Sequence, residues 1–414
     1  MTAGVPGSFI CRGCGGGRLD PVLSLGKTPL ANALLTADQL SRPEATYPLD
    51  LVLCLDCALV QITESVPPEE LFSEYAYFSS FSDALLRHAA ALTTRLLVER
   101  RLHTGSLVIE IASNDGYLLQ NYTKAGVPVL GIEPARNIAA AAEARGIRTL
   151  NEFFGEALAL RLAGKGLRAD VMHANNVFAH VPDPGGFARG LAALLREDGI
   201  AVIEVPYVKD LIDHCEFDTI YHEHLSYFSL TAIERIFRKN GLRVVDVERV
   251  SIHGGSLRVT ASRMDGTLTA APGVAALLSE EAAWGADDPA FYRSFGDRVQ
   301  HLKTELVSLL GTLKQAGHRI AAYGAAAKGA TLLNCFGIDT RLLDFVVDRS
   351  THKQGRSMPG ARLPIVDPAR LLEDQPDYVL LLAWNFADEV LAQQAEYRAR
   401  GGRFIIPIPD VRVV

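Results

Sequence analysis

The chain has 414 residues and a formal net charge of −7, and 48% of its residues are hydrophobic. This length predicts two or three domains, and the balance of apolar and charged residues excludes extensive disorder. The acidic charge argues against nucleic-acid binding, which requires clustered Lys and Arg. The N-terminus lacks the pattern of a secretory leader, and no apolar run reaches the ~20 residues of a membrane helix. We therefore expect a cytoplasmic protein without a membrane partner.

The first region, residues 1–66, is short, rich in turns and contains four of the six cysteines. They form two Cys-x-x-Cys pairs, and two such pairs can supply the four ligands of one tetrahedral zinc. With four protein ligands the site is closed, so the metal is expected to be structural; four unrelated buried thiols are the alternative. Cys215 and Cys335 are isolated and are expected to be ordinary packing residues. The expected zinc ligands are Cys11, Cys14, Cys54 and Cys57.

Two further regions, residues 67–262 and 263–414, alternate helical and strand patterns, which is typical of mostly parallel α/β sheets. In the second region we expect helices at 83–101, 137–145 and 186–195, and strands at 107–111, 127–132, 171–174 and 200–205. In the third region we expect a long helix at 291–316 and strands at 319–323, 345–347, 378–383 and 403–406. The predicted architecture is a small zinc-binding domain followed by two Rossmann-like α/β domains.

A ligand-binding pattern starts at the strand that leads into Ala112–Gly116. About twenty residues later, Glu133 ends the next strand, where an acid can accept hydrogen bonds from ribose hydroxyls. Ala112 and Asn114 stand where glycine is usual, which disfavours a pyrophosphate and favours S-adenosylmethionine, a cofactor without one. A third segment, Asn175–Asp183, resembles the one after the fourth strand of class I methyltransferases. The expected cofactor residues are Glu110, Ala112, Asn114, Gly116, Tyr117, Leu118, Glu133, Pro134, Asn175, Asn176 and Phe178.

The densest group of proton-active side chains is the 218–227 segment, which contains Tyr221, His222, Glu223 and His224 in a row. If the segment is extended, Tyr221 shares a face with Glu223, and His222 with His224; a turn or helix would change these pairs. A neutral histidine can act as a base near neutral pH, and a glutamate can orient it. A metal site and a purely structural polar turn are the alternatives.

A second polar and aromatic cluster lies upstream and contains Tyr75, Tyr77 and Ser79. Its hydroxyl groups could bind a substrate oxygen or the carboxylate of the cofactor. Aromatic packing at a domain junction is the structural alternative.

The motifs, in order CxxC…CxxC, EIASNDGYL, NVFAHVPD, YHEHLSYFS, HGGSLR and YGAAAKG, together resemble the deoxysugar C-methyltransferases of antibiotic biosynthesis over essentially the whole chain. Within that family the chain resembles the sugar C-3-methyltransferases, including that of the D-tetronitrose pathway. The resemblance implies a dTDP-linked 4-keto-6-deoxy sugar as substrate. It also implies that His224 removes the C-3 proton, with Tyr221, Glu223, Tyr75 and His180 around the sugar, and His222 as the next candidate base.

The diphosphate of such a substrate needs an anion site. The HGGSLR motif offers glycine amides and an arginine, and the YGAAAKG motif offers the start of a helix. The expected substrate residues are Tyr77, Ser79, His253, Arg258, Tyr323, Lys328, Trp384 and Asn385. A nicotinamide-dependent sugar-nucleotide oxidoreductase, with Asp348 on a ribose, is the alternative enzyme, and zinc knuckles that grip RNA or a protein are the alternative binding module. The sequence leaves the oligomeric state open, with a monomer as the working assumption.

Overall fold

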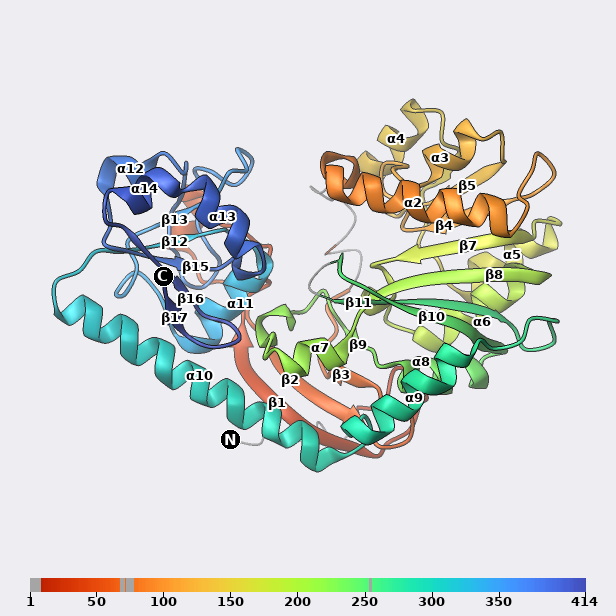
Figure 1. Cartoon of the computed structure of the whole chain (residues 1–414), viewed down its shortest axis with the longest axis horizontal. Helices are drawn as coiled ribbons and strands as arrows, with labels where there is room; N and C mark the ends of the chain where they lie inside the picture. The colour runs from red at the N-terminus through yellow and green to blue at the C-terminus, as the bar shows by residue number, and fades with distance from the viewer. Residues whose placement is uncertain (1–8, 68–70, 72–77, 253–254) are drawn as a thin grey trace.

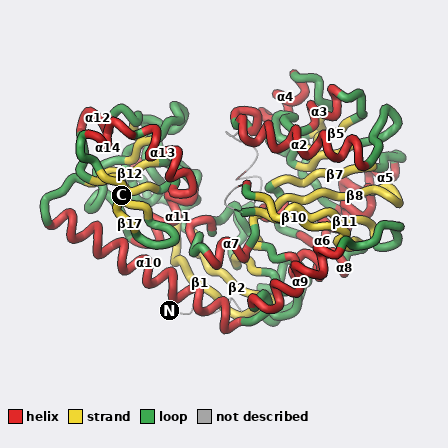
Figure 2. Tube along the Cα trace, viewed as in Figure 1, coloured by secondary structure: helices red, strands yellow, loops and turns green. Residues whose placement is uncertain are grey.

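The structure, a computed structural model, describes residues 9–67, 71, 78–252 and 255–414. It contains three β-sheets. Figure 1 and Figure 2 show two α/β lobes side by side, with the N-terminal strands at the base between them. The predicted α/β class is confirmed. Within the described ranges, no helix is long and apolar enough to cross a membrane.

The N-terminal sheet is antiparallel and has the order β1-β2-β3-β9. Its strands are β1 Leu19–Thr28, β2 Tyr47–Cys54, β3 Val60–Ile62 and β9 Ser226–Tyr227, and the 3-10 helix η1 Ala37–Ser41 lies between β1 and β2. The fourth strand comes from the middle of the chain, because Val60 pairs with Tyr227 and Gln61 with Ser226. The sequence did not predict this exchange.

The central sheet has seven strands in the order β10-β11-β8-β7-β4-β5-β6. They are β4 Val108–Ile111, β5 Val129–Ile132, β6 Thr149–Leu150, β7 Ala169–Asn175, β8 Leu195–Pro206, β10 Leu242–Val250 and β11 Ser256–Arg263. The strands from β6 to β8 run parallel, whereas β11 is antiparallel to both of its neighbours. All four residues of β4 are buried, as expected for a strand covered on both faces.

Helices cover both faces of the central sheet. They are α2 Asp83–Glu99, α3 Leu119–Lys124, α4 Arg136–Ala144, α5 Glu156–Gly164, α6 Pro184–Leu194, α8 Leu230–Lys239 and α9 Pro272–Trp284. The short helix α7 Val208–Asp213 packs instead in the core of the N-terminal sheet. Val108 and Val171 pack toward α2 and α3, while their neighbours Ile109 and Met172 pack toward α5, α6 and α8. Although α9 lies beyond residue 263, its buried Val274 joins the core of the central sheet.

The C-terminal sheet has six strands in the order β14-β13-β12-β15-β16-β17, parallel except for β17. The strands are β12 Ile320–Tyr323, β13 Val346–Val347, β14 Ile365–Val366, β15 Tyr378–Leu381, β16 Arg403–Ile406 and β17 Arg412–Val413. The helices are α10 Pro289–Gln315, α11 Ala327–Phe336, α12 Arg370–Asp374, α13 Ala387–Gln393 and α14 Ala395–Ala399.

The long helix α10 joins the C-terminal lobe to the N-terminal sheet (Figure 1). Pro289 at its first position and the Asp288 cap start the helix, and buried side chains then recur every three or four residues. Phe295 and Leu302 share one core with Leu51 of β2 and Leu380 of β15. One face of the N-terminal sheet is therefore continuous with the core of the C-terminal lobe.

Candidate active site

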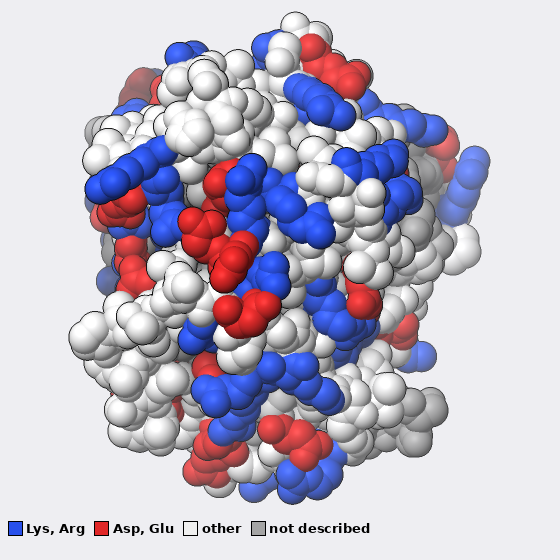
Figure 3. Space-filling view, turned by 90° about the vertical axis from the view of Figure 1, so that its right-hand side faces the viewer, with Lys and Arg blue, Asp and Glu red and all other residues white. Residues whose placement is uncertain are grey.

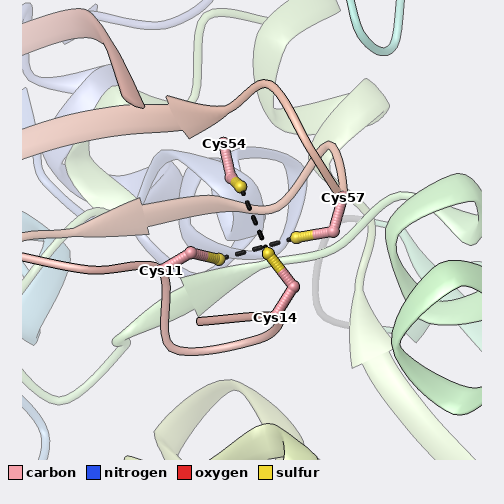
Figure 4. Close-up of side chains that lie close together, drawn as sticks. All are labelled: Cys11, Cys14, Cys54 and Cys57. Atoms are coloured by element: carbon pink, nitrogen blue, oxygen red, sulfur yellow. Dashed lines mark hydrogen bonds between the residues drawn. The ribbon is translucent and has the colours of Figure 1, made fainter. Parts of the chain in front are cut away.

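The four cysteines of the two Cys-x-x-Cys pairs point toward one another from two loops (Figure 4). Their sulfur atoms all lie within 4.8 Å of one another, with Cys11–Cys57 at 3.5 Å and Cys14–Cys54 at 3.6 Å. A tetrahedral zinc with bonds of about 2.3 Å requires sulfur atoms about 3.8 Å apart. This donor set therefore fits zinc.

The loop after β4 uses a left-handed backbone at three alternate residues. Ala112 has φ 51°, Asn114 has φ 47° and Gly116 has φ 80°. Glycine adopts this conformation freely, whereas for alanine it costs about 1–2 kcal/mol. The Asn114 side chain stabilises the turn, because its Oδ1 accepts hydrogen bonds from the backbone N–H groups of Ser79 and Asp115. Strain of this kind is typical of ligand-binding loops.

Two buried acids stand behind this loop. Glu133, just after β5, accepts the backbone N–H of Asn114 at 3.0 Å and that of Ala135 at 2.9 Å. Burial raises its pKa, and the two backbone hydrogen bonds partly oppose that shift. Burial also raises the pKa of Glu110 well above its ordinary value, and the charges of Glu133 and Asp115 raise it further. Burial and these two charges therefore favour the protonated form of Glu110.

Polar atoms at this edge of the sheet fit a bound cofactor. Glu110 Oε2, Asn175 Oδ1 and Asn176 Oδ1 are buried and have no hydrogen-bond partner among the described residues. Buried polar atoms are nearly always paired in folded proteins, so these atoms indicate a polar ligand at the carboxyl ends of β4 and β7. Asn176 also has a left-handed backbone, with φ 55°.

The remaining expected cofactor residues lie at different depths. Ala112 and Pro134 are half-buried at the same edge of the sheet. Tyr117 and Leu118 belong to the core under α2. Phe178, in the 3-10 helix η3 Phe178–His180, is fully buried and stacks on Phe228 at 4.4 Å. The last three therefore support the loops from behind.

His224 is oriented by two hydrogen bonds. Its Nδ1 lies 3.0 Å from the carbonyl oxygen of Thr219, and its Nε2 lies 3.1 Å from the hydroxyl of Tyr221. A carbonyl can only accept, so Nδ1 carries the hydrogen and Nε2 is the basic nitrogen of the neutral ring. The sequence left open whether this segment is extended or turned, and the structure shows a turn at residues 222–223, which brings Tyr221 to His224.

His180 packs edge-on against His224, with ring centres 4.8 Å apart. Burial lowers the pKa of His180 to about 4, so this ring is neutral near pH 7. A neutral neighbour adds no positive charge that would oppose the protonation of His224. The pair is therefore compatible with His224 as a proton acceptor.

His222 and Glu223 face the N-terminal sheet and not His224. His222 Nε2 donates to the carbonyl oxygen of Pro48 at 3.0 Å, and burial lowers its pKa. The carboxylate of Glu223 accepts the side-chain amide of Asn32 at 2.6 Å, and burial raises its pKa. Both residues tie the 218–227 segment to the N-terminal sheet, whose strand β9 is part of the same segment.

The C-terminal residues lie against the start of the same segment. Trp384, in the 3-10 helix η6 Trp384–Phe386, donates its indole N–H to Asp218 at 2.8 Å. Lys328, near the start of α11, places Nζ 4.3 Å from the centre of the Trp384 ring. Tyr323 ends β12 and is buried, and Asn385 is exposed.

The other expected substrate residues are dispersed. Ser79, in the 3-10 helix η2 Ser79–Phe81, is buried and donates its backbone N–H to Asn114. Arg258 is buried on β11, where its guanidinium pairs with Glu204 at 2.6 Å and Glu248 at 2.9 Å. These carboxylates already neutralise Arg258, so a diphosphate would have to compete with them. Tyr75, Tyr77 and His253 lie outside the described residues.

Three contributors were missed by sequence reasoning. Asn32 and Thr219 act through an amide and a backbone carbonyl, for which the sequence carries no signal. Asp218 stood inside the polar segment, and its role could have been suspected from the run of proton-active residues. Burial raises its pKa to about 6, which Lys328 and Trp384 partly oppose.

Comparison with known proteins covers most of the chain. Residues 11–72 match a family model described as "Putative zinc binding domain", residues 82–247 one described as "Methyltransferase domain", and residues 251–409 one described as "C-methyltransferase C-terminal domain". The C-methyltransferase NovU of Streptomyces niveus is 38% identical over 405 residues, which are 98% of this chain and 96% of NovU. The chain belongs to this family of C-methyltransferases.

The enzyme is therefore an S-adenosylmethionine-dependent C-methyltransferase with a zinc-binding N-terminal region. The oxidoreductase alternative is set aside, and in the C-terminal lobe Asp348 already accepts the backbone N–H of Ala325 at 2.7 Å. On the face shown in Figure 3, Lys and Arg alternate with Asp and Glu over the described residues.

Solved methyltransferase structures resemble part of the chain. The magnesium protoporphyrin IX methyltransferase ChlM of Synechocystis PCC 6803 is 16% identical with a TM-score of 0.33, and covers 43% of this chain and 79% of its own. The 1,6-didemethyltoxoflavin-N1-methyltransferase of Burkholderia thailandensis is 22% identical with a TM-score of 0.32, and covers 44% and 78%. We draw no conclusion from similarities this low.

Proposed function

We propose that the enzyme methylates C-3 of a dTDP-linked 4-keto-6-deoxy sugar that carries a 3-amino group, in the biosynthesis of an antibiotic deoxysugar. The proposal rests on the orientation of His224, whose Nδ1 donates to the Thr219 carbonyl, so that Nε2, next to the Tyr221 hydroxyl, is the basic nitrogen. Free thiols at the zinc site agree with a reducing cytoplasm, and a monomer remains the working assumption.

The chemistry proceeds through proton abstraction beside the ketone. His224 Nε2 takes the proton from C-3, and the electron pair of the broken C–H bond forms the enolate of the C-4 ketone. Tyr221 and His180 lie next to His224 and are candidates to donate to the developing negative charge. The enolate carbon would then accept the methyl group that bound S-adenosylmethionine supplies, and His224 would keep the proton taken from C-3.

Bound S-adenosylmethionine supplies an electrophilic methyl group. Glu133 would accept hydrogen bonds from its ribose, and the unpartnered amide oxygens of Asn175 and Asn176 would contact its polar end. The loop from Ala112 to Gly116 would position it beside the 218–227 segment. Positioning of the two reacting carbons contributes much of the acceleration in such a reaction.

The nucleotide half of the sugar would extend toward the C-terminal lobe. Lys328 offers a positive charge at the start of α11, and Tyr323 and Asn385 flank the same edge of the C-terminal sheet. Arg258 is a weaker candidate, because two carboxylates already pair with it.

The test is mass spectrometry of dTDP-3-amino-4-keto-deoxysugar incubated in heavy water, with and without S-adenosylmethionine. The wild type should add one methyl group with the cofactor and exchange the C-3 proton without it. The His224→Asn variant should slow both steps by about 10²–10⁴-fold. His103→Asn, in an exposed turn after α2, is the matched control and should behave as the wild type. Exchange that survives in His224→Asn would place the base elsewhere, and a wild type that does neither would contradict the substrate.

A further inference from the structure

The turn that precedes His224 is held in place by contacts with the C-terminal lobe. This turn is the 3-10 helix η4 Phe217–Thr219. Phe217 is fully buried and stacks on Phe336 of α11, with ring centres 4.8 Å apart and planes 17° apart. Asp218, also fully buried, accepts the indole N–H of Trp384 at 2.8 Å. Two consecutive residues of the turn therefore end in the C-terminal lobe, one through an apolar contact and one through a polar contact.

The indole of Trp384 makes one contact through its N–H group and another through the face of its ring. Its N–H donates to Asp218, and Lys328 Nζ lies 4.3 Å from its ring centre. A buried hydrogen bond to a carboxylate is costly to leave unmade, because the acceptor would lose solvation without compensation. Trp384 therefore holds Asp218 in one position.

The third residue of the turn carries the contact to the base. Thr219 donates its backbone N–H and its side-chain hydroxyl to the carbonyl oxygen of Glu216, at 3.1 Å and 2.7 Å. Its own carbonyl oxygen accepts His224 Nδ1 at 3.0 Å. Because Asp218 and Thr219 are adjacent residues of one tight turn, a shift of Asp218 moves the acceptor that orients His224.

We propose that Trp384 is a positioning residue for His224, acting across the boundary between the two lobes through Asp218 and the Thr219 carbonyl. This inference rests on the proposed function, in which His224 is the base. It assigns to Trp384 a task other than the direct substrate contact expected from the sequence. The C-terminal lobe then sets the tautomer of the base without touching the reacting carbon.

The chain contains its own control for the indole interaction. Trp284, at the end of α9, donates its N–H to Asp213 at 2.8 Å, and Lys209 Nζ lies 5.5 Å from its ring centre. The same three residue types thus meet at Trp284, where Lys209 and Asp213 belong to α7, the helix that precedes η4. Trp384→Phe and Trp284→Phe remove the same donor and keep an aromatic ring. Their acceptors differ, because Asp218 is fully buried whereas Asp213 is exposed and also pairs with Lys209 Nζ at 2.5 Å.

The first readout is the tautomer of His224 in the protein without substrate. Two-bond ¹H–¹⁵N correlation spectra of histidine-labelled protein are recorded above neutral pH, and His224 is assigned with the His224→Asn variant. The wild type and Trp284→Phe should show the Nδ1–H tautomer, whereas Trp384→Phe should show a mixture of both tautomers. An unchanged tautomer in Trp384→Phe would overturn the inference. Since no sugar is needed, this result is independent of the proposed substrate.

The second readout is steady-state methylation. Trp384→Phe should lower kcat by about 10–100-fold with KM unchanged, because a misplaced base slows the chemical step. A raised KM with unchanged kcat would mean that Trp384 contacts the substrate, and would also overturn the inference. If Trp384 acts through Asp218, adding Trp384→Phe to Asp218→Ala should produce no further loss. Additive losses would contradict that route. An inactive wild type would contradict the proposed function instead.

Discussion

The central and the C-terminal lobe each place an acid after the second parallel strand, and each acid accepts a backbone N–H from the loop after the first strand. In the central lobe Glu133 accepts from Asn114 at 3.0 Å, and in the C-terminal lobe Asp348 accepts from Ala325 at 2.7 Å. The strand neighbours also correspond, because β4 lies between β5 and β7 as β12 lies between β13 and β15.

The two lobes differ in what surrounds this shared arrangement. In the C-terminal lobe Lys353 Nζ lies 3.7 Å from Asp348 and donates to the Ala325 carbonyl, which closes the loop with a residue of the protein itself. In the central lobe Asn175 and Asn176 follow β7 with amide oxygens that have no partner within the described ranges. At the matching place after β15, Trp384 bonds to Asp218. The edge of the central sheet thus carries buried polar atoms without a described partner, whereas the loop after β15 in the C-terminal sheet bonds to a neighbouring segment. This difference illustrates that function lies in the loops of a fold.

We expect the largest effect from removal of zinc, to which the different sheets should respond differently. Removing the metal with a chelator, or substituting Cys54→Ser, should abolish methylation, because structural zinc sites contribute directly to folding. Hydrogen exchange should accelerate in β1–β3 and in the 218–227 segment, which is tied to them by β9 and by Asn32–Glu223. Strands β15 and β16 should lose less protection, because one of their faces packs in a core that does not include the N-terminal sheet. Equal loss of protection in all three sheets would contradict this separation.

A second prediction compares the two acids directly. Glu133→Gln should weaken S-adenosylmethionine binding by about 100-fold in isothermal titration calorimetry, since hydrogen bonds to a charged acceptor contribute about 1.5–3 kcal/mol each. Asp348→Asn is the matched change in the C-terminal lobe and should leave the Kd unchanged. A comparable loss in Asp348→Asn would mean that the C-terminal loop also serves the cofactor.

The last prediction concerns the pH dependence of stability and the residue Glu110, the third residue of β4. The third residue of the corresponding strand β12 is Ala322. The pKa of Glu110 is raised well above its ordinary value by burial, so the folded state holds a proton that the unfolded state releases. Stability should therefore fall as pH rises above the unfolded pKa of about 4.3, by about 1.4 kcal/mol per pH unit until the folded pKa is passed. Glu110→Gln should remove this slope. The check is Tm against pH for both proteins, and parallel curves would contradict the assignment.

Much of the fold follows from local patterns in the sequence. The predicted helix at 83–101 is α2, which Ser82 caps and whose buried residues are three or four apart. The apolar runs at 107–111, 127–132, 171–174 and 200–205 correspond to β4, β5, β7 and β8, and the paired cysteines converge as their spacing predicts. These features depend on neighbours within a few residues, which is why sequence reasoning finds them.

Features that depend on distant pairing were not found. Strand β9 has only two residues and no periodicity, and its partner β3 lies far away in the sequence. His224 shows a different limit, because the sequence left open whether its segment is extended or turned, and in the structure the Tyr221 carbonyl accepts the backbone N–H of His224 in a turn. Arg258 looked like an anion ligand until the fold brought Glu204 and Glu248 to it.

Strand β9, which the middle of the chain contributes to the N-terminal sheet, also has a consequence for the design of chimeric enzymes. A chimera cut near residue 66 would take β1, β2 and β3 from one parent and β9 from the other, and would ask Val60 and Gln61 to pair with a foreign Ser226–Tyr227 strand. On its C-terminal-lobe side, the same segment has to match Phe336, which stacks on Phe217, and Trp384, which donates to Asp218. Residues 216–227 therefore pack against both the N-terminal sheet and the C-terminal lobe. In a chimera they have to come from the same parent as their contact partners on both sides.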